Sequence, residues 1–171
     1  SVGLGSGDGV ATVANAGGYS SCAIQAIGAT PIYMDVDAEN HCATLASLQA
    51  VMPQQPKAVI ITHLFGRLAP EIEAIAAFCQ ERQILLIEDC AQAHGARRQG
   101  RCAGSFGLAS CFSFYPTKNL GALGDGGAIC SGDAAVAERC RQLRQYGWER
   151  KYHSRLAGGR NSRLDELQAR L

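Results

Sequence analysis

The sequence predicts an α/β fold in which a central, mostly parallel sheet is flanked by helices. The main observation is an alternation: between residues 10 and 88, short apolar runs of strand length are separated by stretches of helical periodicity. Strands that alternate with helices in this way form parallel βαβ units. A length of 171 residues suits one domain, and 47% hydrophobic residues can supply its core.

The expected elements follow the chain in order. Strands are expected at 10–14, 32–35, 58–62 and 84–88, and helices at 19–27, 44–51 and 71–82. Gly28 is a C-terminal stop for the first helix, Thr44 an N-cap for the second, and Pro70 suits the first turn of the third. After residue 89 the pattern changes, because the strands expected at 109–114 and 128–131 are separated by a Gly-rich turn without a helix. A long helix is then expected at 134–146.

Composition and charge exclude several classes of function. The net charge is +1 and no basic cluster stands out, so we expect no nucleic-acid partner. No apolar run has the length needed to span a bilayer, and no signal segment opens the sequence, so no membrane partner is expected. The first residue is not Met and residues 164–171 resemble the middle of a helix, so the chain is expected to be part of a longer protein.

The eight cysteines predict neither a disulfide framework nor a metal site. The closest pair is nine residues apart, no C-x-x-C occurs, and none has a His at zinc-finger spacing. Most of them lie in apolar stretches, where a free cysteine behaves as a small hydrophobic residue. We interpret them as the reduced thiols of a cytoplasmic protein.

Three segments carry residues that could do chemistry. Asp89 follows the fourth predicted strand, where a carboxylate could cap a helix, ligate a metal or pair with a cationic ring nitrogen. Lys118 lies beside a tight turn, which suits a surface residue as well as a catalytic one. The run 121–127 could be a flexible hairpin or a phosphate cradle, but it has the spacing of neither a P-loop nor a dinucleotide fingerprint.

Considered together, these segments indicate one kind of binding site. Parallel sheets bind ligands at the carboxyl ends of their strands, which directs attention to His63 and Asp89. Asp89 and Lys118 end different strands of the predicted sheet, so a flat ring could lie between them. Pyridoxal phosphate needs a lysine for an imine, an acid for its ring nitrogen and donors for its phosphate, and the turn before Lys118 could bring the Ser113 hydroxyl to that phosphate. For His63 and His94, a packed, hydrogen-bonded ring and a general acid–base role remain alternatives.

Five motifs in order make the sequence resemble the DegT/DnrJ/StrS family of sugar aminotransferases, within the fold-type I pyridoxal-phosphate enzymes. They are His63-Leu64-Phe65-Gly66, Glu88 to Gly95, Phe112 to Leu120, Gly124 to Gly127, and Asn161 to Glu166. The segment from Gly5 through Asp37 also fits the family. The resemblance covers nearly the whole chain, so residues 1–171 are expected to be the cofactor-binding large domain. The family's N-terminal segment and its small C-terminal domain are missing from the sequence.

The resemblance implies roles for individual residues around pyridoxal 5'-phosphate. Lys118 would form the Schiff base and shuttle a proton during catalysis. Asp89 would keep the pyridine nitrogen protonated, and Gln92 would lie near the 3-hydroxyl of the ring. Ser113 would bind the phosphate.

Two further residues complete the implied site. Tyr19 falls where the family places an aromatic residue that stacks on the cofactor, although Asn15-Ala16-Gly17-Gly18 departs from the commoner Pro-x-x-Thr pattern. Asn161 would reach the phosphate of a neighbouring subunit, which implies a homodimer with shared active sites.

The function that the resemblance implies is amino transfer from glutamate or glutamine to a nucleotide-linked keto sugar. A second activity within the family removes a hydroxyl group, but there a His replaces the imine-forming lysine, so Lys118 argues against it. A regulatory or scaffold protein is a third alternative. The joint presence of Asp89, Gln92, Ser113 and Lys118 counts against it.

Overall fold

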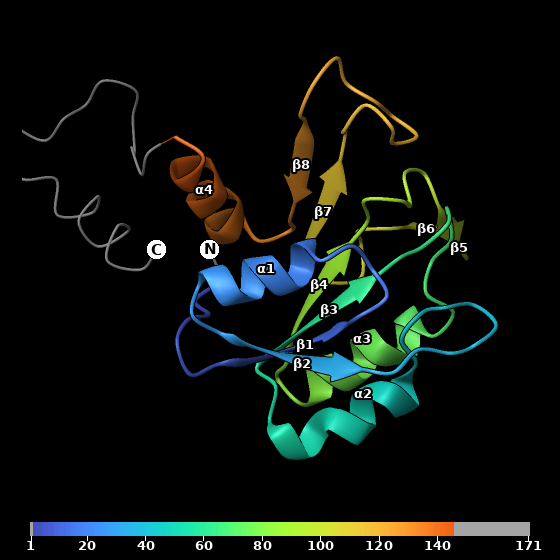
Figure 1. Cartoon of the computed structure of the whole chain (residues 1–171), viewed down its shortest axis with the longest axis vertical. Coiled ribbons are helices and arrows are strands. Elements are labelled where there is room, and N and C mark those ends of the chain that lie inside the picture. Colours follow the sequence, from blue (N-terminus) through green and yellow to red (C-terminus); the bar gives the residue numbers. More distant parts are fainter. Residues whose placement is uncertain (1, 146–171) are drawn as a thin grey trace, which may run out of the picture.

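The centre of the fold is a six-stranded sheet with the strand order β2-β1-β3-β4-β7-β8. A computed structural model describes residues 2–145 of the chain. The strands are β1 (Gly9–Val13), β2 (Thr30–Met34), β3 (Ala58–Thr62), β4 (Leu85–Asp89), β7 (Ala109–Ser113) and β8 (Gly127–Cys130). The first five are parallel, and β8 runs antiparallel to β7. The predicted sheet is therefore confirmed (Figure 1).

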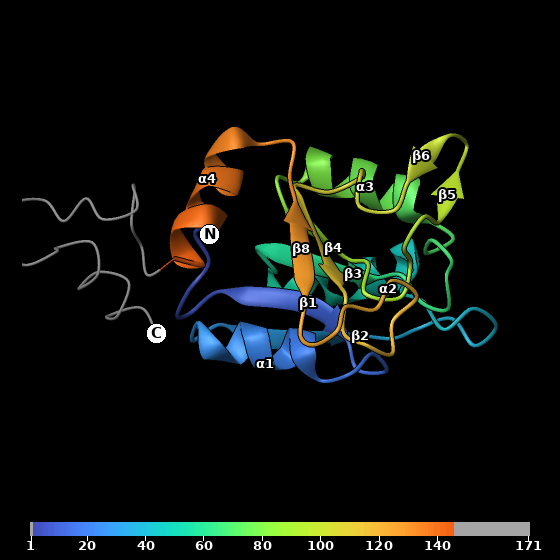
Figure 2. The ribbon, with the colours of Figure 1, turned by 90° about the horizontal axis from the view of Figure 1, so that it is seen from above.

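Helices cover both faces of this sheet. Helix α1 (Tyr19–Ala26) lies on one face, and α2 (Leu45–Val51) and α3 (Ile72–Glu81) lie on the other, as Figures 1 and 2 show from two directions. The chain moves outward from β1 to β2 and then returns past β1 to β3 and β4. Because βαβ crossovers are right-handed, this change of direction places the later helices on the opposite face. The topological switch point therefore lies between the carboxyl ends of β1 and β3.

Two hydrophobic clusters hold the layers together. The larger lies between the sheet and the pair α2 and α3, where Leu48, Ile72 and Ile75 pack with Val59 and Ile61. All five side chains are fully buried, and burying an aliphatic side chain of this size contributes about 1.5–3 kcal/mol. The smaller cluster lies under α1. Strands β1, β3 and β4 therefore each have one face toward each cluster, and this alternation determines on which face the side chains at their ends lie.

Local signals in the sequence account for the ends of several elements. The Thr44 side chain accepts a hydrogen bond from the Ser47 N–H at 3.1 Å, and the Ser47 hydroxyl accepts one from the Thr44 N–H, which confirms the predicted cap. Gly28 follows α1 with φ of +74°, as a helix stop requires. Pro70 lies one residue before the N-cap Glu71 rather than in the first turn of α3.

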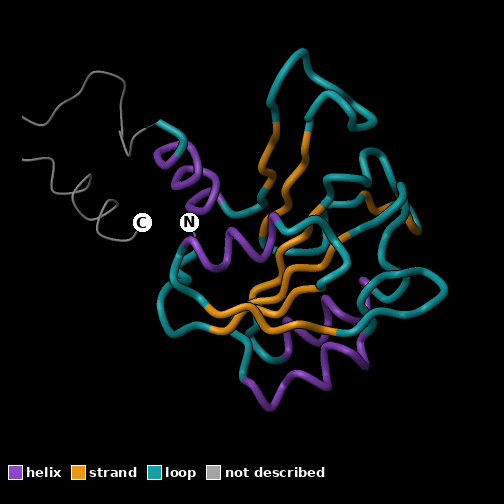
Figure 3. The backbone as a smooth tube through the Cα atoms, in the orientation of Figure 1, coloured by secondary structure: helices purple, strands orange, loops and turns teal. Residues whose placement is uncertain are grey.

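Most predicted elements agree with the structure to within one or two residues, and three small ones were missed. These are a 3₁₀ turn η1 (Met52–Gln54) and a hairpin of β5 (Arg97–Arg98) and β6 (Arg101–Cys102). The two short strands of the hairpin lie among the loops, where Figure 3 colours them as strands. Strands of two residues are too short to show an alternation in the sequence. The last helix, α4 (Ala134–Leu143), ends before residue 146, which lies outside the described residues. Its Asp133 cap accepts hydrogen bonds from the N–H groups of Ala135 and Val136.

All eight cysteines are free thiols, as the sequence predicted. Among residues 2–145, no helix has the length and apolar character needed to cross a membrane.

Candidate active site

Strand β4 ends with two adjacent acids that face opposite sides of the sheet. Leu85 packs with the cluster under α1, whereas Leu86 belongs to the larger cluster on the side of α3. Side chains alternate along a strand. Asp89 therefore shares the α1 face, and Glu88, which is fully buried, points into the larger core. The two carboxylates have different surroundings although they are neighbours in sequence.

Polar side chains of several elements meet on the α1 face. Asp89 is paired in register with Cys111 of β7, so Ser113, two residues further, lies on the same face at the same edge. The Ser113 hydroxyl accepts a hydrogen bond from the Tyr115 N–H at 3.3 Å. Asp89 is half-buried, and its Oδ1 accepts a hydrogen bond from the Ala91 N–H at 3.0 Å. No residue in the range 2–145 donates a hydrogen bond to Asp89 Oδ2.

Lys118 lies in the loop that joins β7 to β8. The loop is folded onto itself: the Lys118 N–H donates to the Tyr115 carbonyl at 2.8 Å, and the Ala122 N–H donates to the Phe114 carbonyl at 2.8 Å. Gly121 is required here, because a Cβ at this position would lie 2.5 Å from the Pro116 carbonyl oxygen. Strands β4 and β7 are neighbours, so Asp89 at the end of β4 and the loop that carries Lys118 follow adjacent strands. The prediction that they end different strands is correct for Asp89, whereas Lys118 lies in the turn beyond its strand.

Gln92 joins the end of β4 to the loop after β3. Its side-chain Oε1 accepts a hydrogen bond from the Phe65 N–H at 3.3 Å, and its carbonyl oxygen accepts one from the Gly66 N–H at 2.8 Å. The carbonyl of Asp89 also accepts a hydrogen bond from the His63 N–H, at 2.9 Å. The segment that carries Asp89 and Gln92 is thus fixed by the loop that follows the neighbouring strand.

The remaining two predicted site residues differ in what the structure shows. Tyr19 is the first residue of α1, on the same face of the sheet as Asp89, and 84% of its surface is exposed. Helix α1 begins beyond the carboxyl end of β1, so the N–H groups of Ser20 and Ser21, which have no hydrogen-bond partner among residues 2–145, lie at the edge where Asp89 lies. Asn161 is outside the described residues.

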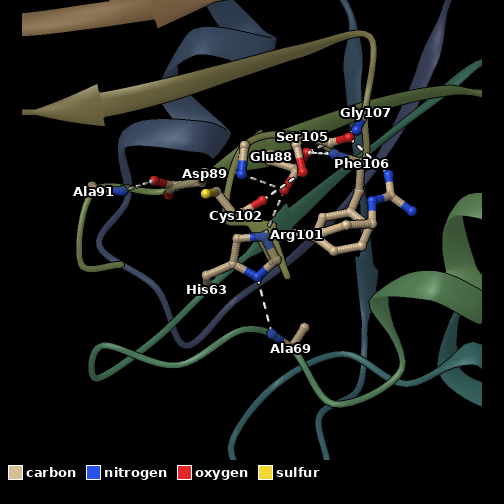
Figure 4. Close-up of polar contacts among 11 residues, drawn as sticks. His63, Ala69, Glu88, Asp89, Ala91, Arg101, Cys102, Ser105, Phe106 and Gly107 are labelled. Atoms are coloured by element: carbon tan, nitrogen blue, oxygen red, sulfur yellow. Dashed lines mark hydrogen bonds and ion pairs between the residues drawn. The ribbon is translucent and has the colours of Figure 1, made fainter. Parts of the chain in front are cut away.

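On the opposite face, Glu88 accepts four hydrogen bonds. Its Oε1 accepts from the N–H groups of Phe106 (2.6 Å) and Gly107 (2.7 Å), and its Oε2 accepts from the Gly104 N–H (2.8 Å) and from His63 Nε2 (2.9 Å), as Figure 4 shows in part. Burial alone would raise the pKa of Glu88, but the hydrogen bonds from His63 and from these backbone groups outweigh it. The pKa of Glu88 therefore lies below its ordinary value.

The same contacts determine the role of His63, which is fully buried. Its Nδ1 accepts a hydrogen bond from the Ala69 N–H at 3.0 Å, so the proton of the neutral ring is assigned to Nε2, which donates to Glu88 (Figure 4). Both ring nitrogens are occupied on the face away from Asp89. Of the two alternatives, the structure supports a packed, hydrogen-bonded His63.

His94 is different. Its ring lies 5.7 Å from those of Phe112 and Phe114, between centroids, and both of its nitrogens are buried without a hydrogen-bond partner among residues 2–145. These contacts agree with a packed ring rather than a hydrogen-bonded one.

One group of buried side chains has the composition of a metal site. The ligand atoms of His63, Glu88 and Cys90 lie within 4.8 Å of one another. However, both nitrogens of His63 and both oxygens of Glu88 already bond to protein groups. Burial, and next the charges of Glu88 and Asp89, raise the pKa of the Cys90 thiol, which disfavours the thiolate that a metal requires. The cluster is therefore a hydrogen-bond network.

A mostly parallel sheet flanked by helices, with a carboxylate at the end of a central strand and a lysine in the loop after the next strand, is the arrangement expected of the fold-type I class of pyridoxal-phosphate-dependent transferases. Comparison with known proteins narrows this class. The chain belongs to the DegT/DnrJ/EryC1/StrS aminotransferase family, whose model matches residues 1–171.

Individual relatives agree with this assignment. The chain is 44% identical over 171 residues to the dTDP-3-amino-3,4,6-trideoxy-alpha-D-glucose transaminase of Micromonospora megalomicea subsp. nigra, covering 100% of this chain and 46% of that protein. It is 43% identical over 167 residues to the pleiotropic regulatory protein of Geobacillus stearothermophilus, covering 98% and 44%. The X-ray structure of S. venezuelae DesV in complex with a ketimine intermediate is similar with a TM-score of 0.83 and 35% identity, covering 98% of this chain and 46% of DesV. The chain thus spans about half the length of the curated relatives it matches.

The polar residues at the carboxyl ends of β4 and β7 and in the loops that follow fit the cofactor that this family implies. A carboxylate, an amide, a hydroxyl and a lysine come from β4, β7 and their loops. In addition, the hydroxyls of Thr12 and Thr62 are buried without a hydrogen-bond partner in the described part of the chain, and Thr62 is paired in register with Asp89. Polar groups concentrated on one face next to Asp89 suit a polar ring with a phosphate.

Sequence reasoning missed the threonines and the network of Glu88. Thr12 and Thr62 lie inside apolar runs, where a threonine is common in any strand. Glu88 carried a stronger signal: it follows a run of apolar residues and precedes Asp89, so strand alternation places one of the two acids in the core.

Proposed function

We propose that the chain is the cofactor-binding large domain of a pyridoxal-phosphate-dependent aminotransferase. It would transfer an amino group from glutamate or glutamine to a nucleotide-linked keto sugar. The observation that carries the proposal is that Asp89 ends β4 and Lys118 lies in the loop after the neighbouring strand β7, in a chain that belongs to this family. The substrate class is supported by the name of the Micromonospora relative.

When bound, pyridoxal phosphate supplies a carbonyl carbon for amine exchange and a ring that accepts electron density. Asp89 would hold a proton at the pyridine nitrogen, using the Oδ2 atom that no described residue contacts. Gln92 would donate its amide N–H to the 3-hydroxyl oxygen, because its Oε1 already accepts from Phe65. Lys118 Nζ would bind the cofactor. It would then move a proton between the cofactor carbon and the substrate carbon that exchange the amino group.

The phosphate and the ring face have their own contacts in this proposal. The Ser113 hydroxyl and the first-turn N–H groups of α1 would bind the phosphate, since a helix N-terminus favours an anion. The ring of Tyr19 would cover one face of the cofactor and exclude water from it. Asn161 would reach the phosphate of a partner subunit in a homodimer, and the intact enzyme would work in the cytoplasm.

The direct test is to locate the cofactor on the chain. The intact protein is incubated with pyridoxal phosphate, reduced with borohydride, digested and mapped by mass spectrometry. The proposal requires the label on Lys118, and a label on Lys57 or Lys151 instead would refute it. Lys118→Ala should lose the label and the amino-transfer activity while keeping its circular dichroism spectrum, since a lysine in a turn contributes little packing.

A second candidate function is favoured by the relative that is named a pleiotropic regulatory protein. A regulatory protein that lacks amino transfer would bind cofactor without turning it over. Conversion of the bound cofactor by glutamate or glutamine, followed by absorbance, separates the two functions. Mass-spectrometric screening of nucleotide-linked keto sugars then identifies the acceptor.

A further inference from the structure

Thr62, the last residue of β3, carries a hydroxyl that the described part of the chain does not use. The residue is 6% exposed, and its Oγ1 is buried without a hydrogen-bond partner among residues 2–145. A buried hydroxyl that forms no hydrogen bond destabilises a folded protein, and each such group calls for an explanation. The hydroxyl of Thr62 therefore points to a contact that forms in another state of the protein.

Strand alternation places this hydroxyl beside Asp89. Ile60 packs with the cluster under α1 and Ile61 belongs to the larger cluster, so Thr62 lies on the α1 face, as Asp89 does. Thr62 and Asp89 are also partners in the parallel register of β3 and β4. Because neighbouring strands lie only about 4.7–4.9 Å apart, two side chains in register on one face are neighbours. A change of side-chain rotamer then brings a hydroxyl and a carboxylate oxygen into hydrogen-bond range without a movement of the backbone.

Asp89 offers one oxygen for such a contact. Its Oδ1 accepts the hydrogen bond from the Ala91 N–H at 3.0 Å, which Figure 4 draws as a dashed line. Its Oδ2 receives no hydrogen bond from any residue in the range 2–145. A carboxylate oxygen can accept two hydrogen bonds, so Oδ2 has room for one from Thr62 and one from the protonated ring nitrogen of the cofactor. An unused donor and an unused acceptor of the described chain thus lie side by side on neighbouring strands.

A hydrogen bond from Thr62 would restrict the orientation of the Asp89 carboxylate. With Oδ1 bonded to the backbone and Oδ2 bonded to Thr62, neither oxygen can rotate away without losing a donor. Groups that contact a ligand are commonly held in place by hydrogen bonds from the residues behind them. We propose that Thr62 is a positioning residue of the candidate active site, whose hydroxyl donates a hydrogen bond to Asp89 Oδ2 when the cofactor is bound and so orients the carboxylate toward the ring nitrogen. This inference rests on the proposed function and adds a residue to its site.

The test measures the binding of pyridoxamine 5'-phosphate to the intact protein by calorimetry. This probe has the same ring nitrogen but an amine in place of the aldehyde, so it forms no covalent bond with Lys118 and its dissociation constant reports noncovalent contacts alone. Thr62→Val removes the hydroxyl at nearly constant volume and should weaken binding about threefold to tenfold, the loss expected for one hydrogen bond. Thr62→Ser keeps the hydroxyl and should bind the probe within about twofold of the parent.

Further measurements separate positioning from a loss of packing. In the Asp89→Asn background, Thr62→Val should change the dissociation constant by less than about twofold, because the charged acceptor through which Thr62 acts is gone. Without cofactor, Thr62→Val should unfold at the same urea concentration as the parent or at a higher one, because a methyl group replaces a hydroxyl without a partner. Ser110→Ala is the matched control. It removes another buried hydroxyl that has no partner among residues 2–145, on the opposite face of the sheet beside Glu88, and should bind the probe like the parent.

Any of five results would overturn the inference: parental binding by Thr62→Val, an equal loss with Thr62→Ser, an equal loss in the Asp89→Asn background, an equal loss with Ser110→Ala, or a lower unfolding midpoint for Thr62→Val without cofactor. The proposed function is checked on the same parent protein by borohydride labelling of Lys118 with pyridoxal phosphate. A parent that is labelled on Lys118, with a Thr62→Val variant that binds the probe unchanged, refutes the role of Thr62 alone. A parent that is not labelled there refutes the proposed function, and the inference with it.

Discussion

Replacing Glu88 by Gln tests the fully buried hydrogen-bond network of Glu88 and His63. The substitution keeps the shape of the side chain and changes one oxygen into an NH₂ group. In the parent, Oε1 and Oε2 each accept two hydrogen bonds, all from donors that belong to backbone or to His63. An NH₂ group cannot accept any of them.

The expected loss follows from the geometry. If the NH₂ group replaces Oε1, the N–H groups of Phe106 and Gly107 lose their acceptor; if it replaces Oε2, Gly104 N–H and His63 Nε2–H lose theirs. His63 cannot rescue the second case, because moving its proton to Nδ1 would deprive the Ala69 N–H of its acceptor. Each unsatisfied buried donor costs about 1–3 kcal/mol, so two cost about 2–6 kcal/mol of unfolding free energy. This is a large part of the stability of an ordinary domain.

The pH dependence has a defined sign. The pKa of Glu88 is lower in the folded protein than in the unfolded chain. The stability that its ionised form contributes is therefore complete above the unfolded pKa, which is about 4.3. It is lost as the pH falls through the folded pKa. The parent and Glu88→Gln should differ most at neutral pH and converge in acid.

The assay is urea unfolding of the intact protein at fixed concentration, followed by circular dichroism between pH 7 and pH 3. Glu138→Gln, which removes an exposed carboxylate paired with Arg141 at 3.2 Å, is the matched control and should change stability by less than about 0.5 kcal/mol. A loss below about 1 kcal/mol for Glu88→Gln at pH 7, or a difference from the parent that grows in acid, would refute the reasoning.

The remaining predictions concern the candidate active site. Asp89→Asn should retain part of the cofactor but lose most amino-transfer activity, because a neutral amide cannot hold the ring nitrogen protonated. The lost contact is worth roughly 1.5–3 kcal/mol in binding. A near-parental turnover rate would make Asp89 only a turn residue. Mixing inactive Lys118→Ala subunits with inactive Asn161→Ala subunits should restore activity, because one site of the mixed dimer then has both residues. No recovery in a mixed dimer confirmed by mass would show that Asn161 does not serve a partner.

The sequence predicted the sheet well because its strands are apolar runs with clear breaks. It also predicted the acid at the end of β4 and the lysine after β7, since both follow strand ends in order. It did not predict the fourfold bonding of Glu88, because three of the donors come from the turn at 104–107, which has no periodic signal.

The loop after β3 connects the hydrogen-bond network of Glu88 with the candidate active site. His63 bonds Glu88 through its side chain, while its backbone N–H donates to the Asp89 carbonyl. Two residues later, the Phe65 N–H donates a hydrogen bond to the Gln92 side chain. Because His63 and Phe65 belong to one short segment, a fixed His63 also restrains the backbone that holds Gln92. We therefore infer that the buried Glu88 helps to position Asp89 and Gln92 from the opposite side of the sheet.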